Sequence, residues 1–161
     1  MRMKKVAVLG VSLVVGLVAM ASGAGSAGPA TVLKASTMVG VTGPYVGATN
    51  PIRGVNGGGV PWAISEGKVV LGADGSLEVK VEGLVLVATG ANPVTSFRAI
   101  VSCQTIVGGA AAVSNVSTDA FPATTTGDSR IEATVALPTP CFAPIVFVTS
   151  PGGSWFAVTG V

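Results

Sequence analysis

The side chains that most often carry out chemistry in enzymes are scarce in this sequence. Histidine is absent from all 161 residues, which removes Ser-His-acid and Cys-His catalysis and the commonest zinc ligand. No serine stands in a G-x-S-x-G sequence, and no D-x-[DN]-x-[DN]-G calcium loop occurs. We therefore expect a protein that is not an enzyme and that uses no metal or cofactor.

Carboxylate pairs are the remaining route to acid-base chemistry. Glu78 and Glu82 share one side of a predicted strand, but four residues of strand separate them by about 13 Å, more than the roughly 5–9.5 Å between the carboxyl groups of glycosidases. We expect them to pair with Lys80 on a solvated face. A carboxylate-dependent hydrolase is the least favoured alternative, because it requires two acidic side chains to converge in a pocket. The candidates are Glu66, Asp74, Asp119, Asp128 and Glu132.

A glycine-rich stretch, RGVNGGGVPW at residues 53–62, raises the question of phosphate binding. A P-loop needs a lysine and a serine or threonine after its last glycine and a helix beyond them, and neither is indicated here. We interpret the stretch as a flexible connector in which Pro61 fixes the path into Trp62. The alternative is a surface loop that contacts a partner through Arg53.

Two adjacent aromatic residues, Trp155 and Phe156, lie in a predicted strand and should point to opposite faces of it. An exposed ring, with Tyr45 or Trp62 nearby, would form a stacking platform for a sugar or a protein contact. The alternative is that these rings close the core of the domain. The candidate ligand or partner contacts are therefore Arg53, Trp62, Trp155 and Phe156.

The N-terminal segment has the three parts of a secretory signal peptide. MRMKK is followed by an apolar run over residues 6–20 and by small residues over 21–27. Cleavage after Ala24 and cleavage after Ala27 both fit this pattern. The apolar run is about 15 residues long, short of the roughly 20 needed to span a bilayer, so no stable membrane anchor is expected after cleavage. We predict a signal peptide over residues 1–27 and a secreted or envelope-associated mature chain.

Removal of the leader changes the charge of the chain. Three basic residues leave with it, so six remain against seven acidic residues and the net charge becomes −1. Such a chain has no electrostatic surface for nucleic acid. An extracellular protein or a cell-envelope glycan is the expected class of partner.

Cys103 and Cys141 are the only cysteines. In an exported chain, an even pair of cysteines most simply forms a disulfide, which here would close a loop of about 39 residues. Their sequence neighbours include no base or cation that would activate a thiol. We therefore expect a structural disulfide between them.

The elements that hold these residues should be strands, because no segment of the mature chain shows helical periodicity. Residues 77–82 alternate between apolar and charged side chains, and Asp74 and Gly75 predict a hairpin to residues 67–71. Further strands are predicted at residues 95–105, 130–137, 145–149 and 155–159, the last two joined as a hairpin, and less clearly at 31–41 and 111–117. Residues 108–112 and 123–127 are predicted as loops.

These strands predict an all-β domain over residues 28–161, a single immunoglobulin-like or Greek-key β-sandwich of about seven or eight strands. No tryptophan lies between the two cysteines, so the likeness to immunoglobulin domains concerns architecture alone. The apolar segments 145–148 and 83–87 carry few charges, and we expect self-association if either lies at a sheet edge.

Three segments, 50–62 (NPIRGVNGGGVPW), 92–105 (NPVTSFRAIVSCQT) and 140–160 (PCFAPIVFVTSPGGSWFAVTG), resemble small secreted bacterial proteins with no assigned activity. The resemblance implies export and a compact β domain, and it implies no activity and no site residues. The leading hypothesis is a non-enzymatic extracellular protein with a structural or interaction role. The alternative is a module that binds a carbohydrate or another small ligand through exposed aromatic rings.

Overall fold

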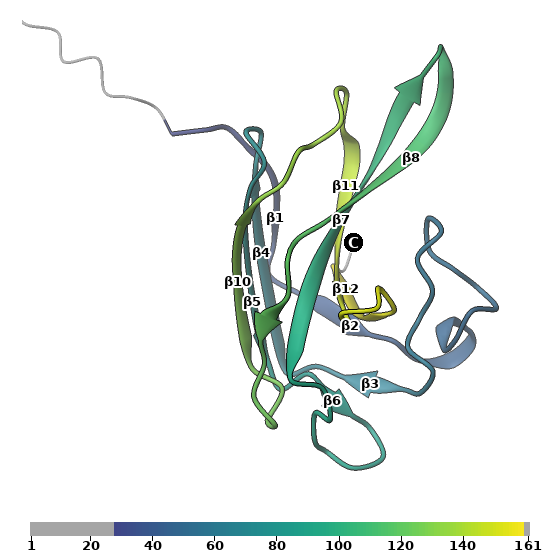
Figure 1. The fold of residues 1–161 in the computed structure, drawn as a ribbon, viewed down its shortest axis with the longest axis vertical. Helices are drawn as coiled ribbons and strands as arrows, with labels where there is room; N and C mark the ends of the chain where they lie inside the picture. Colours follow the sequence, from purple (N-terminus) through teal and green to yellow (C-terminus); the bar gives the residue numbers. More distant parts are fainter. Residues whose placement is uncertain (1–27, 160–161) are drawn as a thin grey trace, which may run out of the picture.

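Residues 28–159 are described by the computed structural model, and the predicted signal peptide with its two cleavage points lies outside these residues. Within them the chain forms strands and one short 3-10 helix, η1 (Gly43–Tyr45) (Figure 1). The strands are β1 (Thr31–Ala35), β2 (Met38–Gly40), β3 (Trp62–Ala63), β4 (Glu66–Gly72), β5 (Ser76–Glu82), β6 (Val85–Leu86), β7 (Ser96–Val107), β8 (Ala110–Ser117), β9 (Phe121–Pro122), β10 (Ser129–Thr134), β11 (Phe142–Thr149) and β12 (Trp155–Thr159). The all-β class is confirmed, whereas an immunoglobulin-like connectivity is not.

A four-stranded antiparallel sheet has the order β1-β4-β5-β10. Its central hairpin confirms the prediction for residues 67–82. The Asp74 carboxylate accepts the Ser76 N–H at 3.0 Å, and Gly75 has a φ of 83°. A Cβ at Gly75 would also lie 2.0 Å from the Val135 carbonyl oxygen. Both the turn and the close packing therefore require glycine at this position.

A six-stranded sheet has the order β2-β12-β11-β7-β8, with β9 pairing with β7 off this path. Its β11–β12 hairpin confirms the predicted turn through residues 150–154, which the Ser150 N–H closes by donating to the Ser154 carbonyl at 2.8 Å. The remaining strands, β3 and β6, form a two-stranded sheet.

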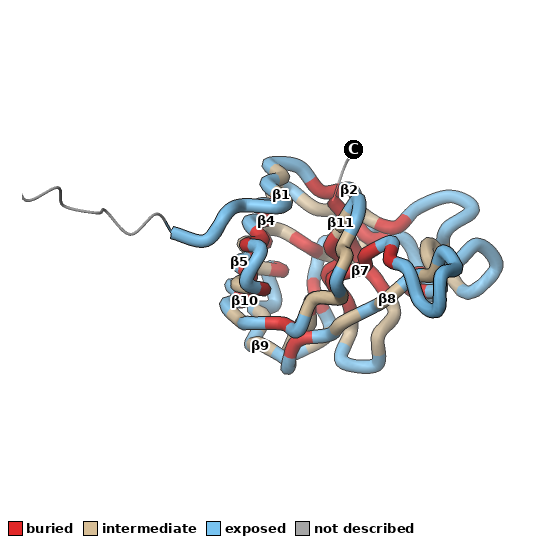
Figure 2. The backbone as a smooth tube through the Cα atoms, turned by 90° about the horizontal axis from the view of Figure 1, so that it is seen from above, coloured by how far each residue is buried: buried red, intermediate tan, exposed pale blue. Residues whose placement is uncertain are grey.

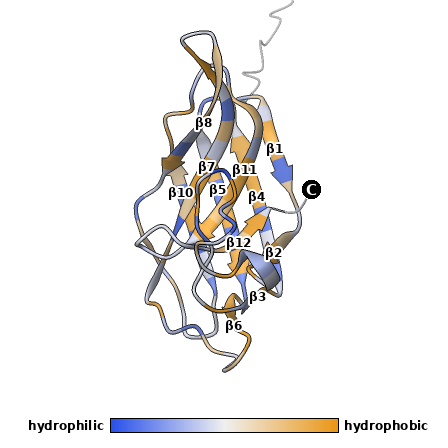
Figure 3. Ribbon diagram, turned by 90° about the vertical axis from the view of Figure 1, so that its right-hand side faces the viewer, coloured by the Kyte–Doolittle hydropathy of each residue, from blue (hydrophilic) through white to orange (hydrophobic). Residues whose placement is uncertain are grey.

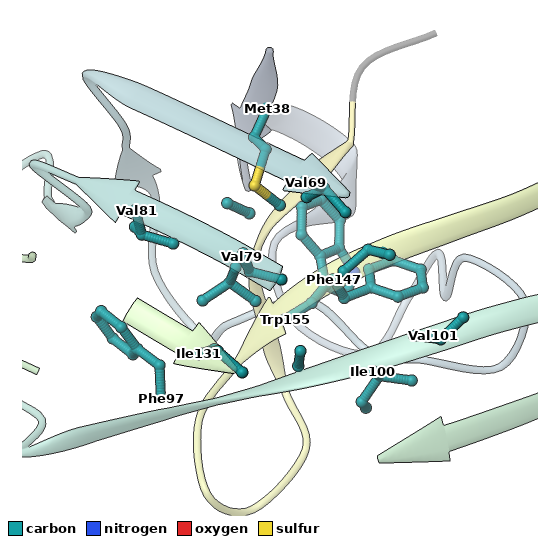
Figure 4. Packing of buried hydrophobic residues seen from close by; sticks show 14 of the residues in the cluster. Met38, Val69, Val79, Val81, Phe97, Ile100, Val101, Ile131, Phe147 and Trp155 are labelled. Atoms are coloured by element: carbon teal, nitrogen blue, oxygen red, sulfur yellow. The ribbon is translucent and has the colours of Figure 1, made fainter. Parts of the chain in front are cut away.

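The core lies between the two larger sheets (Figure 2). Alternate residues of each strand point inward, so β4 and β5 contribute Val69, Leu71, Leu77, Val79 and Val81 while solvent covers the residues between them. The six-stranded sheet contributes Phe97, Val101, Val146 and Val148 from its inner face. Val69 and Val79 of one sheet and Phe97 and Val101 of the other belong to this buried cluster (Figure 4). This packing agrees with a β-sandwich.

Three predicted elements have different bounds in the structure. Residues 31–41 are two strands, because β1 joins the four-stranded sheet and β2 the six-stranded sheet. The strand predicted at 130–137 ends at Thr134, and the chain then crosses to the other sheet through Pro138 and Pro140, which have no N–H to donate. Residues 110–112, predicted as part of a loop, belong to β8.

Candidate functional site

The three candidate aromatic residues lie in the protein interior. Trp62, Trp155 and Phe156 expose 4%, 2% and 5% of their surfaces. Trp62 stacks on Phe156 with ring centroids 3.9 Å apart. The ring centroids of Trp155 and Phe147 are 6.0 Å apart. The interpretation of these rings as an exposed stacking platform is therefore wrong, and the alternative, that they close the core, is confirmed. They stabilise the core by burying large apolar surfaces.

Trp155 and Phe156 do point to opposite faces of β12, and both faces are covered. Phe156 contacts Phe97 of the inner face at a centroid distance of 6.0 Å. Trp155 pairs with Thr149 and points away from the four-stranded sheet, toward Tyr45 at 6.4 Å. Ile100, Ser102 and Phe147 share this outer face and are also buried. Segment 43–62 therefore covers part of the outer face.

The glycine-rich stretch at residues 53–62, here called the strap, is held on that face by backbone hydrogen bonds. The Trp155 N–H donates to the Asn56 carbonyl at 2.9 Å, and the Gly58 N–H donates to the Trp155 carbonyl at 2.8 Å. A Cβ at Gly57 would lie 1.9 Å from the Tyr45 carbonyl oxygen. The stretch is therefore a bonded part of the fold and not a flexible connector, and Gly57 allows the close approach of the Tyr45 backbone.

Arg53 anchors the strap to the six-stranded sheet. Its Nη1 donates to the carbonyl oxygens of Ser102 and Ala143, both at 2.9 Å. The pairing of β11 with β7 is irregular between Phe142 and Ile145, so the guanidinium satisfies carbonyls at a β-bulge. Asn115 Nδ2 of β8 donates in turn to the Arg53 carbonyl at 2.9 Å. These bonds give Arg53 a role within the fold.

The predicted disulfide between Cys103 and Cys141 is present. It ties the middle of β7 to the residue that precedes β11. In the chain-entropy model, a loop of this length stabilises the folded state by about 4 kcal/mol relative to the reduced chain.

Most charged side chains of residues 28–159 lie on the outer face of the four-stranded sheet, in rows that cross its strands. Lys68, Lys80 and Arg130 are cross-strand neighbours and form a basic row. Glu66 pairs with Glu82 on one side of this row, and Glu78 pairs with Glu132 on the other. Ion pairs connect the rows: Lys68 with Glu66 at 2.6 Å, Lys80 with Glu82 at 2.5 Å, and Arg130 with both Glu78 and Glu132.

Three acidic side chains on this sheet and in its adjoining loops have pKa values below their usual range. Hydrogen bonding and attraction by Lys68 hold the pKa of Glu66 below its usual value. Hydrogen bonds from Ser76 lower the pKa of Asp74, and bonds from Thr126 and Gly83 lower the pKa of Asp128. A general acid needs a raised pKa. No cluster of three or more metal-ligating side chains occurs among residues 28–159.

Strand β8 has a different character, and we regard it as the candidate site. It is an outer strand of the six-stranded sheet, its eight residues, AAAVSNVS, carry no charge, and it contains no proline. Figure 1 shows β7 and β8 continuing beyond the sandwich as a projecting hairpin. Unpaired strand edges of this kind bind other strands.

Exposed apolar side chains surround the edge. Ile106, Val113 and Phe142 are 52%, 48% and 53% exposed. Phe142 and Val113 are both cross-strand neighbours of Gln104, so they share the outer face of the hairpin. Figure 3 shows apolar colours at the far end of this hairpin. The patch defined by Ile106, Val113 and Phe142 thus adjoins the β8 edge.

The sequence made self-association conditional on a sheet edge at residues 145–148 or 83–87. Residues 145–148 lie inside β11, between β12 and β7, and residues 83–87 supply only the two-residue β6. The sequence signal available for β8 was the lack of charge over its eight residues. Its position at the edge of the sheet depends on the strand order.

Comparison with known proteins identifies no relative. No protein-family model matches the chain, and no curated protein or solved structure matches it either. Between residues 28 and 159, the structure has no helix with the length and hydropathy required to cross a bilayer.

Proposed function

We propose that the protein is a non-enzymatic interaction module that acts outside the cell and binds protein through β8 and the neighbouring apolar patch. The single observation that carries this proposal is the uncharged, unpaired edge of β8 on a projecting hairpin. The leader pattern of residues 1–27 and the Cys103–Cys141 disulfide support an extracellular location.

A role in protein binding agrees with the distribution of charge over the molecule. The four-stranded sheet presents paired charges to solvent on its outer face, which keeps that face hydrated. The β8 hairpin presents backbone groups and apolar side chains instead, and these are the groups that bind an extended peptide or a strand. The glycan alternative has less support, because Trp62, Trp155 and Phe156 are buried.

A binding measurement on the producing cells tests this proposal. Labelled, oxidised mature protein should bind saturably, and protease treatment of the cells should abolish the binding because the partner is a protein. Val113→Lys places a charge beside the β8 edge and should remove the binding. Val39→Lys is the matched control, because Val39 is 54% exposed on β2 at the opposite edge of the same sheet.

Three results would contradict the proposal. Absence of saturable binding by the wild type would refute a protein partner on the producing cells. Equal binding by the Val113→Lys variant would exclude β8 as the contact. Binding that survives protease treatment but is removed by glycosidases would support a glycan partner instead.

A further inference from the structure

Outer strands of the two larger sheets differ in how their edges are protected. Strand β1 has an irregular register and carries Lys34, β2 has only three residues, and β10 carries Arg130 and Glu132. Short length, irregularity and charge are the features by which proteins prevent pairing at an edge. Strand β8 pairs with β7 in regular register along its whole length and has none of these features.

The backbone groups at the free edge of β8 follow from its pairing with β7. The Thr118 N–H donates to the Ala99 carbonyl at 2.9 Å, which makes these two residues a hydrogen-bonded pair. Because such pairs alternate along an antiparallel ladder, Ala112, Ser114 and Val116 direct their backbone groups toward β7. Outward-directed N–H and C=O groups belong to Ala111, Val113, Asn115 and Ser117, and none of them is hydrogen-bonded by another segment of residues 28–159.

Neutrality of β8 favours one partner in particular. A strand that pairs antiparallel with its own copy around a twofold axis places each residue near its own symmetry mate, so any charge near the axis would face a like charge. The sequence AAAVSNVS avoids this repulsion completely. Recognition of an unrelated strand more often uses complementary charges on the two strands, and β8 carries no charge.

We propose that β8 pairs antiparallel with β8 of a second copy of this chain, around a twofold axis near Val113 and Ser114. This inference rests on the proposed function, since it names the protein that the β8 edge binds. Pairing would join two six-stranded sheets into one continuous sheet. The outer faces would lie on the same side, so Val113 of one copy would adjoin the apolar patch of the other.

The dimensions of the edge set the strength of this dimer. Eight residues of strand span about 27 Å. A contact of that length and one sheet thick buries less surface than the roughly 800 Å² per partner that a standard stable interface buries. We therefore expect a weak dimer that forms as the protein concentration rises.

Sedimentation equilibrium on the oxidised mature chain, from about 10 µM to about 1 mM, tests the pairing. The wild type should shift from monomer to dimer across this range. Val113→Lys should raise the dissociation constant at least about tenfold, because the twofold axis brings two lysines together. Val39→Lys should behave as the wild type. A monomer at every concentration, or equal dimerisation by Val113→Lys, would overturn the proposal.

Amide hydrogen exchange supplies a second readout that needs no variant. Amides of Ala111, Val113, Asn115 and Ser117 should gain protection at high protein concentration. Amides of Ala112, Ser114 and Val116 should be protected at both concentrations, because they bond to β7. Dimerisation without a gain at the first four amides would place the interface elsewhere and refute the β8 pairing.

The two proposals fail separately. A wild type that binds cells saturably but stays monomeric would support the interaction module and refute the pairing of β8 with its own copy. A wild type that dimerises through β8 but binds no cells would support the dimer and refute a protein partner on the cell envelope.

Discussion

Asp128 connects two segments that would otherwise meet only through packing. Its Oδ1 accepts the Gly83 N–H at 2.9 Å, after the end of β5. Its Oδ2 accepts the Thr126 hydroxyl at 2.7 Å, in the loop before β10. Because these donors favour the ionised form, the pKa of Asp128 lies below its usual value near 3.8.

This lowered pKa makes stability depend on pH. The unfolded chain binds a proton at Asp128 at a higher pH than the folded protein does, so the contribution is complete above about pH 5 and is lost as the pH falls through the unfolded-state and then the folded-state pKa. Asp128→Asn should therefore reduce the slope of the unfolding free energy against pH between about pH 5 and pH 3. Urea denaturation at each pH measures this slope. Asp119→Asn, at an exposed residue, is the control, and an equal effect in both variants would refute the argument.

At the scale of elements, the strap determines how β12 is covered. Asn56 and Gly58 bond to both backbone groups of Trp155, and Gly57 lies against the Tyr45 carbonyl. Gly57 and Trp155 thus form a parallel β-bridge, and the strap extends the six-stranded sheet beside β12. The protein buries aromatic side chains on both faces of that sheet as a result.

Two glycines of the strap provide a matched comparison. Gly57→Ala forces a methyl group against the Tyr45 carbonyl and should lower the unfolding free energy by about 1–3 kcal/mol. Gly59→Ala should have little effect, because no atom lies within 4 Å of its Cβ position. Guanidinium denaturation of both variants measures the difference. Equal stabilities would show that the strap moves to accommodate a side chain.

The longer strands could be predicted from the sequence, and the segments that cover their second face could not. Residues 77–82 alternate clearly because Glu78, Lys80 and Glu82 face water on the charged sheet. In contrast, the strap has no periodicity, and the contacts of Gly57 with Tyr45 and of Gly58 with Trp155 join segments that are distant in sequence. Local pattern left the exposure of Trp155 and Phe156 open for the same reason, because it does not reveal what covers the second face of β12.

At the scale of the whole molecule, charge is segregated between the two sheets. The four-stranded sheet carries its rows of acidic and basic side chains, while the β8 edge carries none. Which strand is an edge depends on the order in which distant strands pair, so the sequence alone could not identify β8 as the candidate site. Like-charged neighbours within each row repel one another and depend on the adjacent row for compensation.

Arg130 provides the test of that compensation, because it pairs with both Glu78 and Glu132. Arg130→Met should leave these two carboxylates opposite each other and destabilise the fold more at low ionic strength than at high ionic strength. Thermal unfolding across a salt series measures the effect. Lys34→Met, on the same face at β1, is the control, and a loss of stability that does not change with salt would contradict the argument.

Pairing of β2 with β12 has a consequence for how the chain folds. Met38, Val39 and Gly40 pair with Thr159, Val158 and Ala157, so the six-stranded sheet cannot be completed before β12 has been synthesised. Contacts between such distant segments make folding slow, commonly on the scale of milliseconds to seconds. In a chain that emerges N-terminus first, β2 therefore remains without its partner strand until β12 has emerged, whereas β4 and β5 can pair as soon as both are present.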